Sequence, residues 1–406
     1  MHTAVITGMG VVSPIGHDVA SFAESLFATR HGIAPIDHFD IGDVGMRVVA
    51  RVRDLDLTEH FAARDLRRLD LYSVFGLIAA REAVQQAGLV GSVDPFRLAT
   101  YVTSGLGGLG TFLEEQENLV TRGARRVSPM LIPKQIINML AGLIAIETGA
   151  KGAAMAHTAA CASSAVSIGE AVRLIQHGYA DAVICGGSEV GTQKLVMAGF
   201  ENLRAMTTAT DPDHASIPFD LARGGFVMGE GAGVVVVENA EHARARGATS
   251  LAEVAGYAIT TDASHITAPA EDGVAIDRAI TDALQQAGPH DGRVYVNAHG
   301  TGTPMNDELE VAAIARCLGD SAVVSSTKSM TGHMLGAAGA VEVIASVLAL
   351  NSGRLPATAG TVDLHNDTPI DIVTGSARDE RVDRALSLSL GFGGHNVAVV
   401  LDRVPG

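Results

Sequence analysis

The sequence predicts an α/β fold made of two similar halves. Short apolar stretches typical of buried strands alternate with longer segments of helical periodicity along most of the 406 residues. The order strand, helix, strand favours a parallel sheet covered on both faces. Near residue 250 the alternation starts again without a low-complexity linker. We therefore expect an N-terminal half at 1–250 and a C-terminal half at 251–406 that share one rigid body.

The first half opens with an apolar strand, TAVITG, which we expect to end in a turn rich in glycine and proline. Ser13 stands where a dinucleotide-binding loop has its third glycine, so nucleotide binding is not expected. Periodicity and terminal glycines predict the later elements. They are a helix at 70–88, a strand from 98 that leads into a glycine-rich loop, an apolar helix at 132–152, a helix at 164–178, a buried strand at 180–189 and a valine-rich strand before 239.

The second half repeats this order of elements with different residues. The same signals predict a strand at 251–260, a helix at 273–288, a strand and loop at 293–303, a helix at 306–319, a strand and loop at 321–333, a helix at 336–353 and two strands around a glycine turn at 385–403. The likeness of the two halves lies in the order of their elements, because no repeat is visible letter by letter.

Composition limits the classes of function. Hydrophobic residues make up 47% of the chain and charged residues 18%, as in a globular protein. The mean hydropathy of +0.25 indicates a large buried core, because the longest apolar runs, such as 341–350, are too short to span a membrane. The N-terminus has neither a basic region nor a signal-type apolar stretch, so a cytoplasmic location is expected.

The charge balance bears on partners. The net charge of −16 argues against nucleic acid and membrane-surface partners. Two arginine pairs, Arg67–Arg68 and Arg125–Arg126, are either solvated surface or a local docking patch for an acidic protein.

Three cysteines, Cys161, Cys185 and Cys317, form no CxxC motif, which argues against zinc and disulfides. Cys185 falls in an apolar strand and Cys317 on a helix face, where structural roles are expected. Cys161 stands among small residues just before a helical pattern. The positive end of a helix dipole favours a thiolate, and small neighbours leave room for a carbonyl group. Cys161 is therefore a candidate nucleophile.

Two histidines have a similar setting beside glycine-rich loops. His299 ends a strand in NAHGTGTP, and His333 stands at the start of a helix, five residues after Lys328. A hydrogen-bonded structural histidine is the simpler interpretation of each one alone. One cysteine and two histidines in such positions together favour acyl transfer to a thiol.

Four segments then point to a known family. TAACASSA, NAHGTGTP, STKSMTGHMLGAAGA and SLGFGGHN resemble, in this order and spacing, the elongating β-ketoacyl-acyl carrier protein synthases of the thiolase superfamily. The resemblance covers nearly the whole chain. It implies a thiolase fold, in which two similar halves form a five-layered αβαβα arrangement. It also implies an acyltransferase that joins a Cys-bound acyl chain to malonyl-acyl carrier protein by decarboxylative Claisen condensation.

The resemblance also implies catalytic roles. Cys161 takes the acyl chain, and His299 and His333 assist decarboxylation of the malonyl group and stabilise the enolate. Lys328 supports the histidine pair electrostatically. The backbone N–H groups of Cys161 and Phe392 match the oxyanion hole, and the Phe392 ring matches an aromatic gate near the thiol.

Substrate contacts and partners follow from the same resemblance. Thr301 and Thr303 match hydroxyls that bind the phosphopantetheine arm, and Leu106, Leu131 and Phe200 match positions of the acyl site. Leu131 is expected to reach the pocket of a neighbouring subunit. No metal ion and no resident cofactor are expected, since phosphopantetheine arrives on the acyl carrier protein. The expected partners are that carrier and either a second copy of the chain or a ketosynthase-like chain-length factor.

Departures from the family pattern bear on the pathway. Leu106 stands where isoleucine is common in fatty acid enzymes, Leu131 where phenylalanine is common, and Ala159 where many relatives have threonine. These changes favour type II polyketide or specialised fatty acid biosynthesis over housekeeping fatty acid elongation. A non-catalytic chain-length-factor-like subunit is a third hypothesis, disfavoured because such subunits lack the cysteine and often a histidine.

Overall fold

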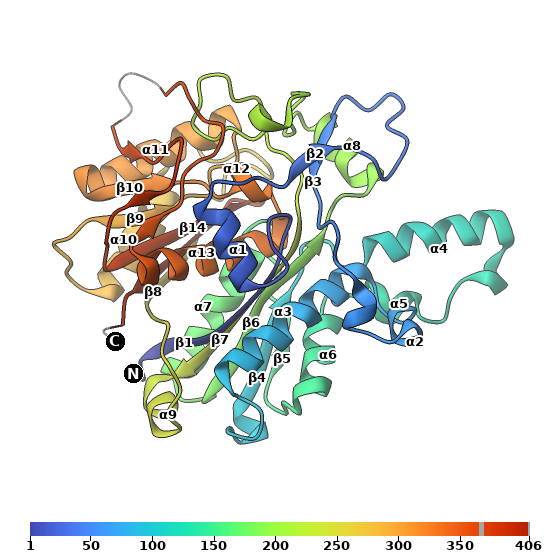
Figure 1. The fold of residues 1–406 in the computed structure, drawn as a ribbon, viewed down its shortest axis with the longest axis horizontal. Helices are drawn as coiled ribbons and strands as arrows, with labels where there is room; N and C mark the ends of the chain where they lie inside the picture. The colour runs from blue at the N-terminus through green and yellow to red at the C-terminus, as the bar shows by residue number, and fades with distance from the viewer. Residues whose placement is uncertain (365–368, 405–406) are drawn as a thin grey trace.

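The computed structural model describes residues 1–364 and 369–404, and in it strands from both halves of the chain form one sheet (Figure 1). The sheet has the strand order β12-β10-β9-β14-β15-β8-β1-β7-β6-β4-β5. The halves join where β1 pairs with β8. The strands of this sheet are β1 (Ala4–Val12), β4 (Leu98–Thr103), β5 (Ala154–Met155), β6 (Ala182–Val190), β7 (Glu230–Asn239), β8 (Ala252–Thr261), β9 (Val294–Asn297), β10 (Ala322–Ser325), β12 (Asp371–Ile372), β14 (Arg384–Gly391) and β15 (His395–Asp402).

The α/β class is confirmed, but the predicted parallel sheet is wrong in its central part. Strand β9 is parallel to β10 and β14, and β4 is parallel to β5 and β6. The strands between these groups, from β14 through β15, β8, β1 and β7 to β6, all pair antiparallel. Apolar alternation identifies a buried strand without giving its direction, so the sequence could not exclude the mixed sheet.

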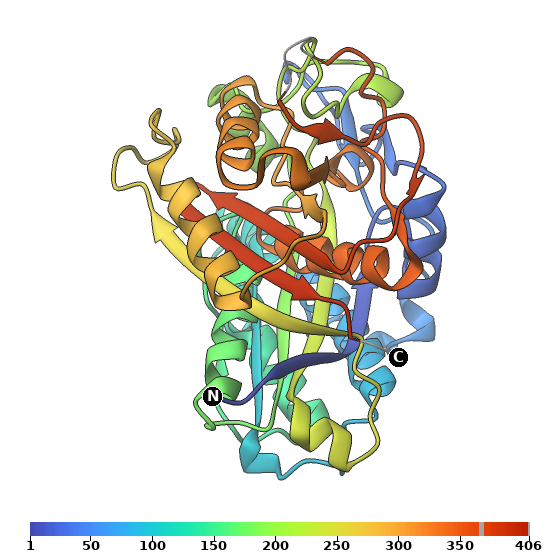
Figure 2. The ribbon, with the colours of Figure 1, turned by 90° about the vertical axis from the view of Figure 1, so that its left-hand side faces the viewer.

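Five layers alternate through the molecule, as the resemblance to the thiolase superfamily implied (Figures 1 and 2). Helices α3 (Leu71–Ala87) and α6 (Met139–Thr148) cover one face of the first-half strands. Helices α7 (Ser163–Gln176) and α13 (Ala338–Ser352) lie between the two groups of strands. Helices α10 (Val274–Ala287) and α11 (Pro304–Leu318) cover the outer face of the second-half strands.

Strand β6 shows how the layers are specified. Val183 and Cys185 face the middle layer, whereas Ala182 and Ile184 face the α3–α6 layer. Successive side chains of a strand point to opposite faces, so a strand covered on both faces is apolar throughout. This explains why no residue of β6 before Ser188 has a polar side chain.

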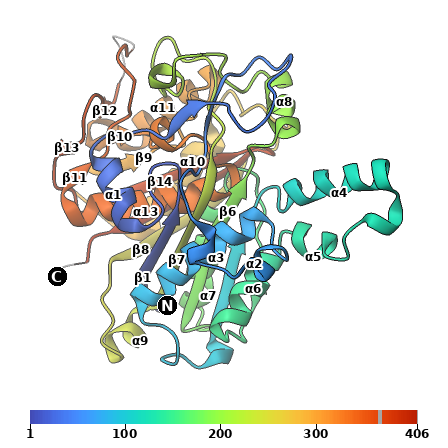
Figure 3. The same cartoon turned by 45° about the vertical axis from the view of Figure 1, so that its right-hand side comes forward.

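The remaining elements connect and border these layers. The helices are α1 (Val19–Phe27), α2 (Ala63–Leu66), α4 (Leu109–Arg122), α5 (Leu131–Gln135), α8 (Lys194–Asn202), α9 (Ala240–Ala245) and α12 (Lys328–Thr331). Two small antiparallel pairs join β2 (Ile33–Pro35) to β3 (Val48–Ala50) and β11 (Arg354–Leu355) to β13 (Arg378–Asp379). Helix α4 projects from the rest of the molecule as an arm (Figure 3).

Two sequence predictions need correction in the first half. The strand β1 does not end in a turn after TAVITG but runs to Val12, and a Cβ atom at Gly8 or Gly10 would collide with the backbone of α3. These glycines therefore let the helix pack directly on the strand. The apolar helix expected at 132–152 is broken into α5 and α6, because Ile136 is extended and its carbonyl accepts a hydrogen bond from Tyr72.

One helical segment has the length and apolar composition of a membrane span. The 18 residues Leu335–Ser352 are long and apolar enough by composition, contrary to the expectation that every apolar run is too short. However, 83% of this window is buried inside the fold. It forms the core helix α13, which packs against α7 and against strands of both halves.

Candidate active site

Cys161 lies in a tight turn that leads into helix α7. The preceding residue, Ala160, has a φ of +48°, a left-handed conformation that is strained for a residue with a Cβ atom. Ser163 holds the turn: its hydroxyl accepts from the Ala159 N–H at 2.9 Å and donates to the Ala160 carbonyl at 2.6 Å. The thiol is thereby fixed just before the first turn of α7, where it is buried.

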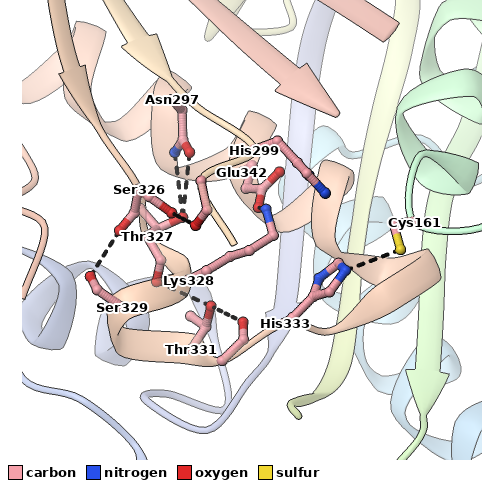
Figure 4. Close-up of polar contacts among 12 residues, drawn as sticks. Cys161, Asn297, His299, Ser326, Thr327, Lys328, Ser329, Thr331, His333 and Glu342 are labelled. Atoms are coloured by element: carbon pink, nitrogen blue, oxygen red, sulfur yellow. Dashed lines mark hydrogen bonds and ion pairs between the residues drawn. The ribbon is translucent and has the colours of Figure 1, made fainter. Parts of the chain in front are cut away.

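His333 faces this thiol from the other half of the chain (Figure 4). Its Nε2 atom is 3.0 Å from the Cys161 Sγ atom. The backbone of His333 is held on both sides, because its N–H donates to the Val227 carbonyl and its carbonyl accepts from the Gly229 N–H. The Phe226 ring packs edge-on against the imidazole, with ring centroids 5.1 Å apart.

His299 completes a pair of imidazoles. Its ring is nearly perpendicular to that of His333, with centroids 5.3 Å apart. Lys328 lies behind the pair and is bound to Glu342 of α13; both of these charged side chains are almost fully buried (Figure 4). The pairing with Glu342 keeps the ammonium group of Lys328 in the interior, where an unpaired charge would be unstable.

The pKa values of both histidines are shifted in one direction. Burial lowers the pKa of His299 well below its ordinary value, and the nearby Lys328 charge and His333 lower it further. Burial and Lys328 likewise hold the pKa of His333 well below its ordinary value. Both imidazoles are therefore neutral at pH 7, so each can donate an N–H to oxygen without carrying a charge.

This shift predicts a pH dependence of stability. The unfolded chain binds protons at these histidines near pH 6.5, whereas the folded chain does not, so the stability they confer is present above pH 6.5 and is lost as the pH falls below it. We expect the free energy of unfolding to fall by about 1.4 kcal/mol per histidine for each pH unit below that value.

Thermal unfolding of the wild type and of a His299→Gln/His333→Gln double variant between pH 8 and 5 measures this effect. The stability difference, wild type minus variant, should decrease as the pH falls. Two curves that stay parallel throughout the range would contradict the assignment of neutral, buried imidazoles.

The thiol departs from its expected state. The sequence predicted that the N-terminus of the following helix favours the thiolate. In the structure burial raises the pKa of Cys161 to about 12, although Lys328 and the Phe392 N–H act in the opposite direction. The resting cysteine is therefore a thiol, and its ionisation requires a proton acceptor such as the facing imidazole.

Phe392 lies where the resemblance implies. Its backbone N–H points at the Cys161 sulfur, and its ring lies 6.0 Å from that of Phe200. A Cβ atom at Gly391 would lie 2.7 Å from the Ala159 carbonyl oxygen and 3.4 Å from the Cys161 nitrogen. Only glycine allows this strand end to approach the nucleophile turn so closely.

A pocket of about 370 Å³ opens above these groups. Among the predicted residues, Thr301 and Thr303 line it together with Phe200, and their two hydroxyls are 3.0 Å apart. Its lining also includes the site residues Cys161, His299, His333 and Phe392, the exposed Leu203, Arg204 and Met305 at its mouth, and the half-buried Asp262, Thr267 and Asn306. The pocket thus leads from the surface to the thiol past two adjacent hydroxyls.

Two predicted acyl-site residues lie outside this pocket. Leu106 packs against the apolar cluster that contains Cys161 but does not line the pocket. Leu131 begins α5, is half-buried and does not line the pocket. Its predicted role requires a second subunit and stays a prediction.

Sequence reasoning missed the acidic residues that hold the His299 loop. Glu310 of α11 is fully buried, and its carboxylate accepts from the N–H groups of His299 at 2.6 Å and Gly300 at 2.7 Å. Asp307, one turn earlier, accepts from the N–H of Gly302. The spacing of Asp307 and Glu310 on one helix face was the available signal, although it does not reveal which loop they hold.

Phe226 and Glu342 were also missed. Each belongs to a segment that reads as ordinary core, an apolar run and a buried helix, so only the fold shows that they contact His333 and Lys328. Among residues 1–364 and 369–404, no group of three or more His, Cys, Asp or Glu side chains is arranged to hold a metal ion.

Comparison with known proteins agrees with this geometry. The family model for the beta-ketoacyl synthase N-terminal domain matches residues 1–243, and that for the C-terminal domain matches residues 251–361. The chain belongs to the beta-ketoacyl synthase family. As a member of this family it is an acyltransferase that forms carbon–carbon bonds, and the family resemblance inferred from its motifs is confirmed.

Relatives of this beta-ketoacyl synthase match over their full length. The 3-oxoacyl-[acyl-carrier-protein] synthase 2 of Synechocystis is 43% identical, over 98% of this chain and 97% of that protein. The protein of the same name from Staphylococcus aureus is 42% identical, over 98% of this chain and 100% of that protein.

Solved structures share the fold of this beta-ketoacyl synthase. The ishigamide ketosynthase/chain length factor superposes with a TM-score of 0.91 at 33% identity, covering 100% of both chains. A type II polyketide synthase ketosynthase, solved in complex with its acyl carrier protein and bound to the hexaketide, superposes with a TM-score of 0.90 at 29% identity. The match covers 99% of this chain and 100% of that chain. A beta-ketoacyl synthase from Burkholderia phymatum gives 0.92 at 29% identity, covering 100% of both. The predicted thiolase fold is confirmed.

Proposed function

We propose that this chain condenses a Cys161-bound acyl group with malonyl-acyl carrier protein, releasing carbon dioxide. The observation that carries the proposal is the 3.0 Å contact between the Cys161 sulfur and His333, with His299 beside it in a pocket that reaches the surface. A thiol with an adjacent base is the arrangement of nucleophilic catalysis. Two neutral imidazoles add donors for an oxyanion.

The first step is acyl transfer to Cys161. The thiol proton passes to the facing His333 imidazole, and the sulfur attacks the thioester carbonyl of an acyl carrier protein. Charge on the carbonyl oxygen is stabilised by the N–H groups of Cys161 and Phe392. The C–S bond to the carrier then breaks, and its thiolate leaves with the proton.

The second step generates the carbon nucleophile. As the C–C bond to the malonyl carboxylate breaks and carbon dioxide leaves, the electron pair moves into an enolate. The N–H groups of His299 and His333 hydrogen-bond its oxygen, and burial, together with the Lys328 charge, keeps both rings neutral. The enolate carbon attacks the acyl-Cys161 carbonyl, and the cysteine thiolate leaves and takes up one proton from water.

The pocket wall suits a carrier-bound substrate. Thr301 and Thr303 place two hydroxyls between the mouth and the thiol, where a phosphopantetheine arm has polar atoms to hydrogen-bond. The rings of Phe200 and Phe392 border the acyl path. On this proposal the arm arrives on the carrier, so no resident cofactor and no metal ion take part.

For the pathway, elongation of ordinary acyl-carrier-protein substrates ranks first. The relatives named 3-oxoacyl-[acyl-carrier-protein] synthase 2 share 42–43% identity with this chain, against 29–33% for the polyketide ketosynthases. Type II polyketide synthesis is the second candidate, because Leu106 and Leu131 alter the acyl site. A non-catalytic subunit is disfavoured, since the cysteine and both histidines are present and assembled.

Two protein partners are proposed. An acyl carrier protein docks at the pocket mouth, where Arg204 offers positive charge and Leu203 and Met305 are exposed. A second chain pairs with the edge strand β5, whose Met155 is exposed next to the exposed Ile146 of α6. The related structures that contain a chain length factor leave a homodimer and a heterodimer as forms of this pairing. A cytoplasmic location suits these partners.

A reconstituted condensation tests the function. The protein, a pre-formed acyl-acyl carrier protein and malonyl-acyl carrier protein should yield a 3-oxoacyl product two carbons longer, detected by intact mass of the carrier, with release of one carbon dioxide. Absence of this product with every chain length from four to eighteen carbons would reject the proposal.

A further inference from the structure

One buried carboxylate, Glu189 at the end of β6, joins two loops from opposite halves of the chain. Its Oε1 atom accepts from the Ser104 hydroxyl at 2.7 Å and the Leu106 N–H at 3.1 Å. Its Oε2 atom accepts from the N–H groups of Gly105 at 2.7 Å and Gly336 at 3.1 Å. The side chain is fully buried, and every one of its partners comes from these two loops.

The hydrogen-bond pattern fixes the charge of this group. The Ser104 hydroxyl accepts from the Gly107 N–H at 2.8 Å, so its own hydrogen is directed at Glu189. The other three partners are backbone N–H groups, which can only donate. Burial raises the pKa of Glu189 and its four hydrogen bonds lower it; four donors and no acceptor around the oxygens are the pattern of an ionised carboxylate.

Each of the two loops carries a leucine that packs beside the nucleophile. Leu106 and Leu335 both pack in the cluster that contains Cys161. A Cβ atom built at Gly191 would lie 3.0 Å from Cδ1 of Leu335 and 3.7 Å from Cδ1 of Leu106, so the ends of both leucines border the same point. The gap between these side chains depends on how the two loops are held together.

Leu335 shows that its loop is held under strain. Its φ is +43°, a left-handed conformation in a residue with a branched side chain. Such a conformation persists only where neighbouring bonds over-determine it. On one side of Leu335 the backbone of His333 is hydrogen-bonded to Val227 and Gly229. On the other side the Gly336 N–H donates to Glu189.

We propose that Glu189 is a positioning residue that sets the separation of the Leu106 and Leu335 side chains and thereby the acyl chain length that Cys161 accepts. The proposal rests on the function proposed above. Glu189 does not touch the substrate and acts through the two loops.

The test compares acylation of Cys161 by octanoyl- and hexadecanoyl-acyl carrier protein. In Glu189→Gln the amide N–H₂ group faces backbone donors in place of an oxygen, so the loops separate. We expect the hexadecanoyl/octanoyl rate ratio to rise about tenfold. Ser104→Ala removes one of the four hydrogen bonds and should raise the ratio less, which keeps the test valid if Glu189→Gln folds poorly.

Glu238→Gln is the matched control. Glu238 is also fully buried and hydrogen-bonded, but it pairs with Ala182 at the opposite end of β6. The substitution Glu238→Gln should lower thermal stability while leaving the rate ratio within about twofold of wild type. A loss of folded protein lowers the rates with octanoyl- and hexadecanoyl-acyl carrier protein equally. An unchanged ratio in folded Glu189→Gln and in Ser104→Ala would overturn the proposal. Failure of the wild type to form any adduct would instead refute the proposed function.

Discussion

Replacement of Cys161 by alanine is expected to abolish the acyl adduct and to lower the condensation rate on the order of 10³-fold or more. The sulfur forms the only covalent bond of the enzyme to the substrate in the proposed mechanism. The fold should tolerate the change, because Ala160 and Ser163 hold the turn through backbone and hydroxyl contacts that do not involve the thiol. Intact mass after incubation with an acyl-acyl carrier protein measures the adduct directly.

The two other cysteines supply the controls. Cys185 is fully buried in β6 and Cys317 is half-buried on α11, so neither is placed to receive the acyl group. Cys185→Ala and Cys317→Ala should therefore acylate like the wild type. An adduct that persists in Cys161→Ala and disappears in either control would move the nucleophile to another site.

His299→Ala and His333→Ala are expected to acylate Cys161 and yet to lose condensation by about 10²- to 10³-fold. Each change removes one neutral N–H from the oxygen of the enolate. Acylation is retained, more slowly in His333→Ala, because the thiol proton then passes directly to the departing carrier thiolate, and the Phe392 N–H and the Lys328 charge, which favour the thiolate, remain beside the sulfur. Adduct mass and malonyl decarboxylation, followed separately, distinguish the two steps.

His157→Ala is the control for this pair. Its ring stacks edge-on against Tyr101, 4.7 Å between centroids, and it does not line the pocket. Condensation should stay within about twofold of wild type, as for a substitution away from the reacting groups. Normal decarboxylation in His299→Ala or His333→Ala, combined with loss of the adduct, would contradict the proposed roles.

The candidate reactive groups could be identified from the sequence because each stands in a short local pattern. Cys161 precedes a helix among small residues, and His299 and His333 stand beside glycine-rich loops. Glu189, Glu310 and Glu342 could not be predicted in this way. Their partners are backbone groups or charges from segments distant in sequence, and a single glutamate in a strand or helix carries no mark of such contacts.

The same distinction holds for the fold. Periodicity places the strands and helices of both halves, including the helix at 70–88 that the structure gives as α3. It does not give strand direction, nor the break between α5 and α6, where Tyr72 captures the carbonyl of Ile136. Local propensity is overridden there by a hydrogen bond to a distant residue.

The pairing of β1 with β8 has a consequence for how substrates enter. Cys161 belongs to one half and both histidines to the other, so a hinge opening between the halves would separate the sulfur from the imidazoles. Shared ladder hydrogen bonds and the packing of α7 against α13 oppose such an opening. We therefore expect access to the thiol to depend on the loops that line the pocket, around Thr267 and Met305, and the sulfur and the imidazoles to keep their spacing.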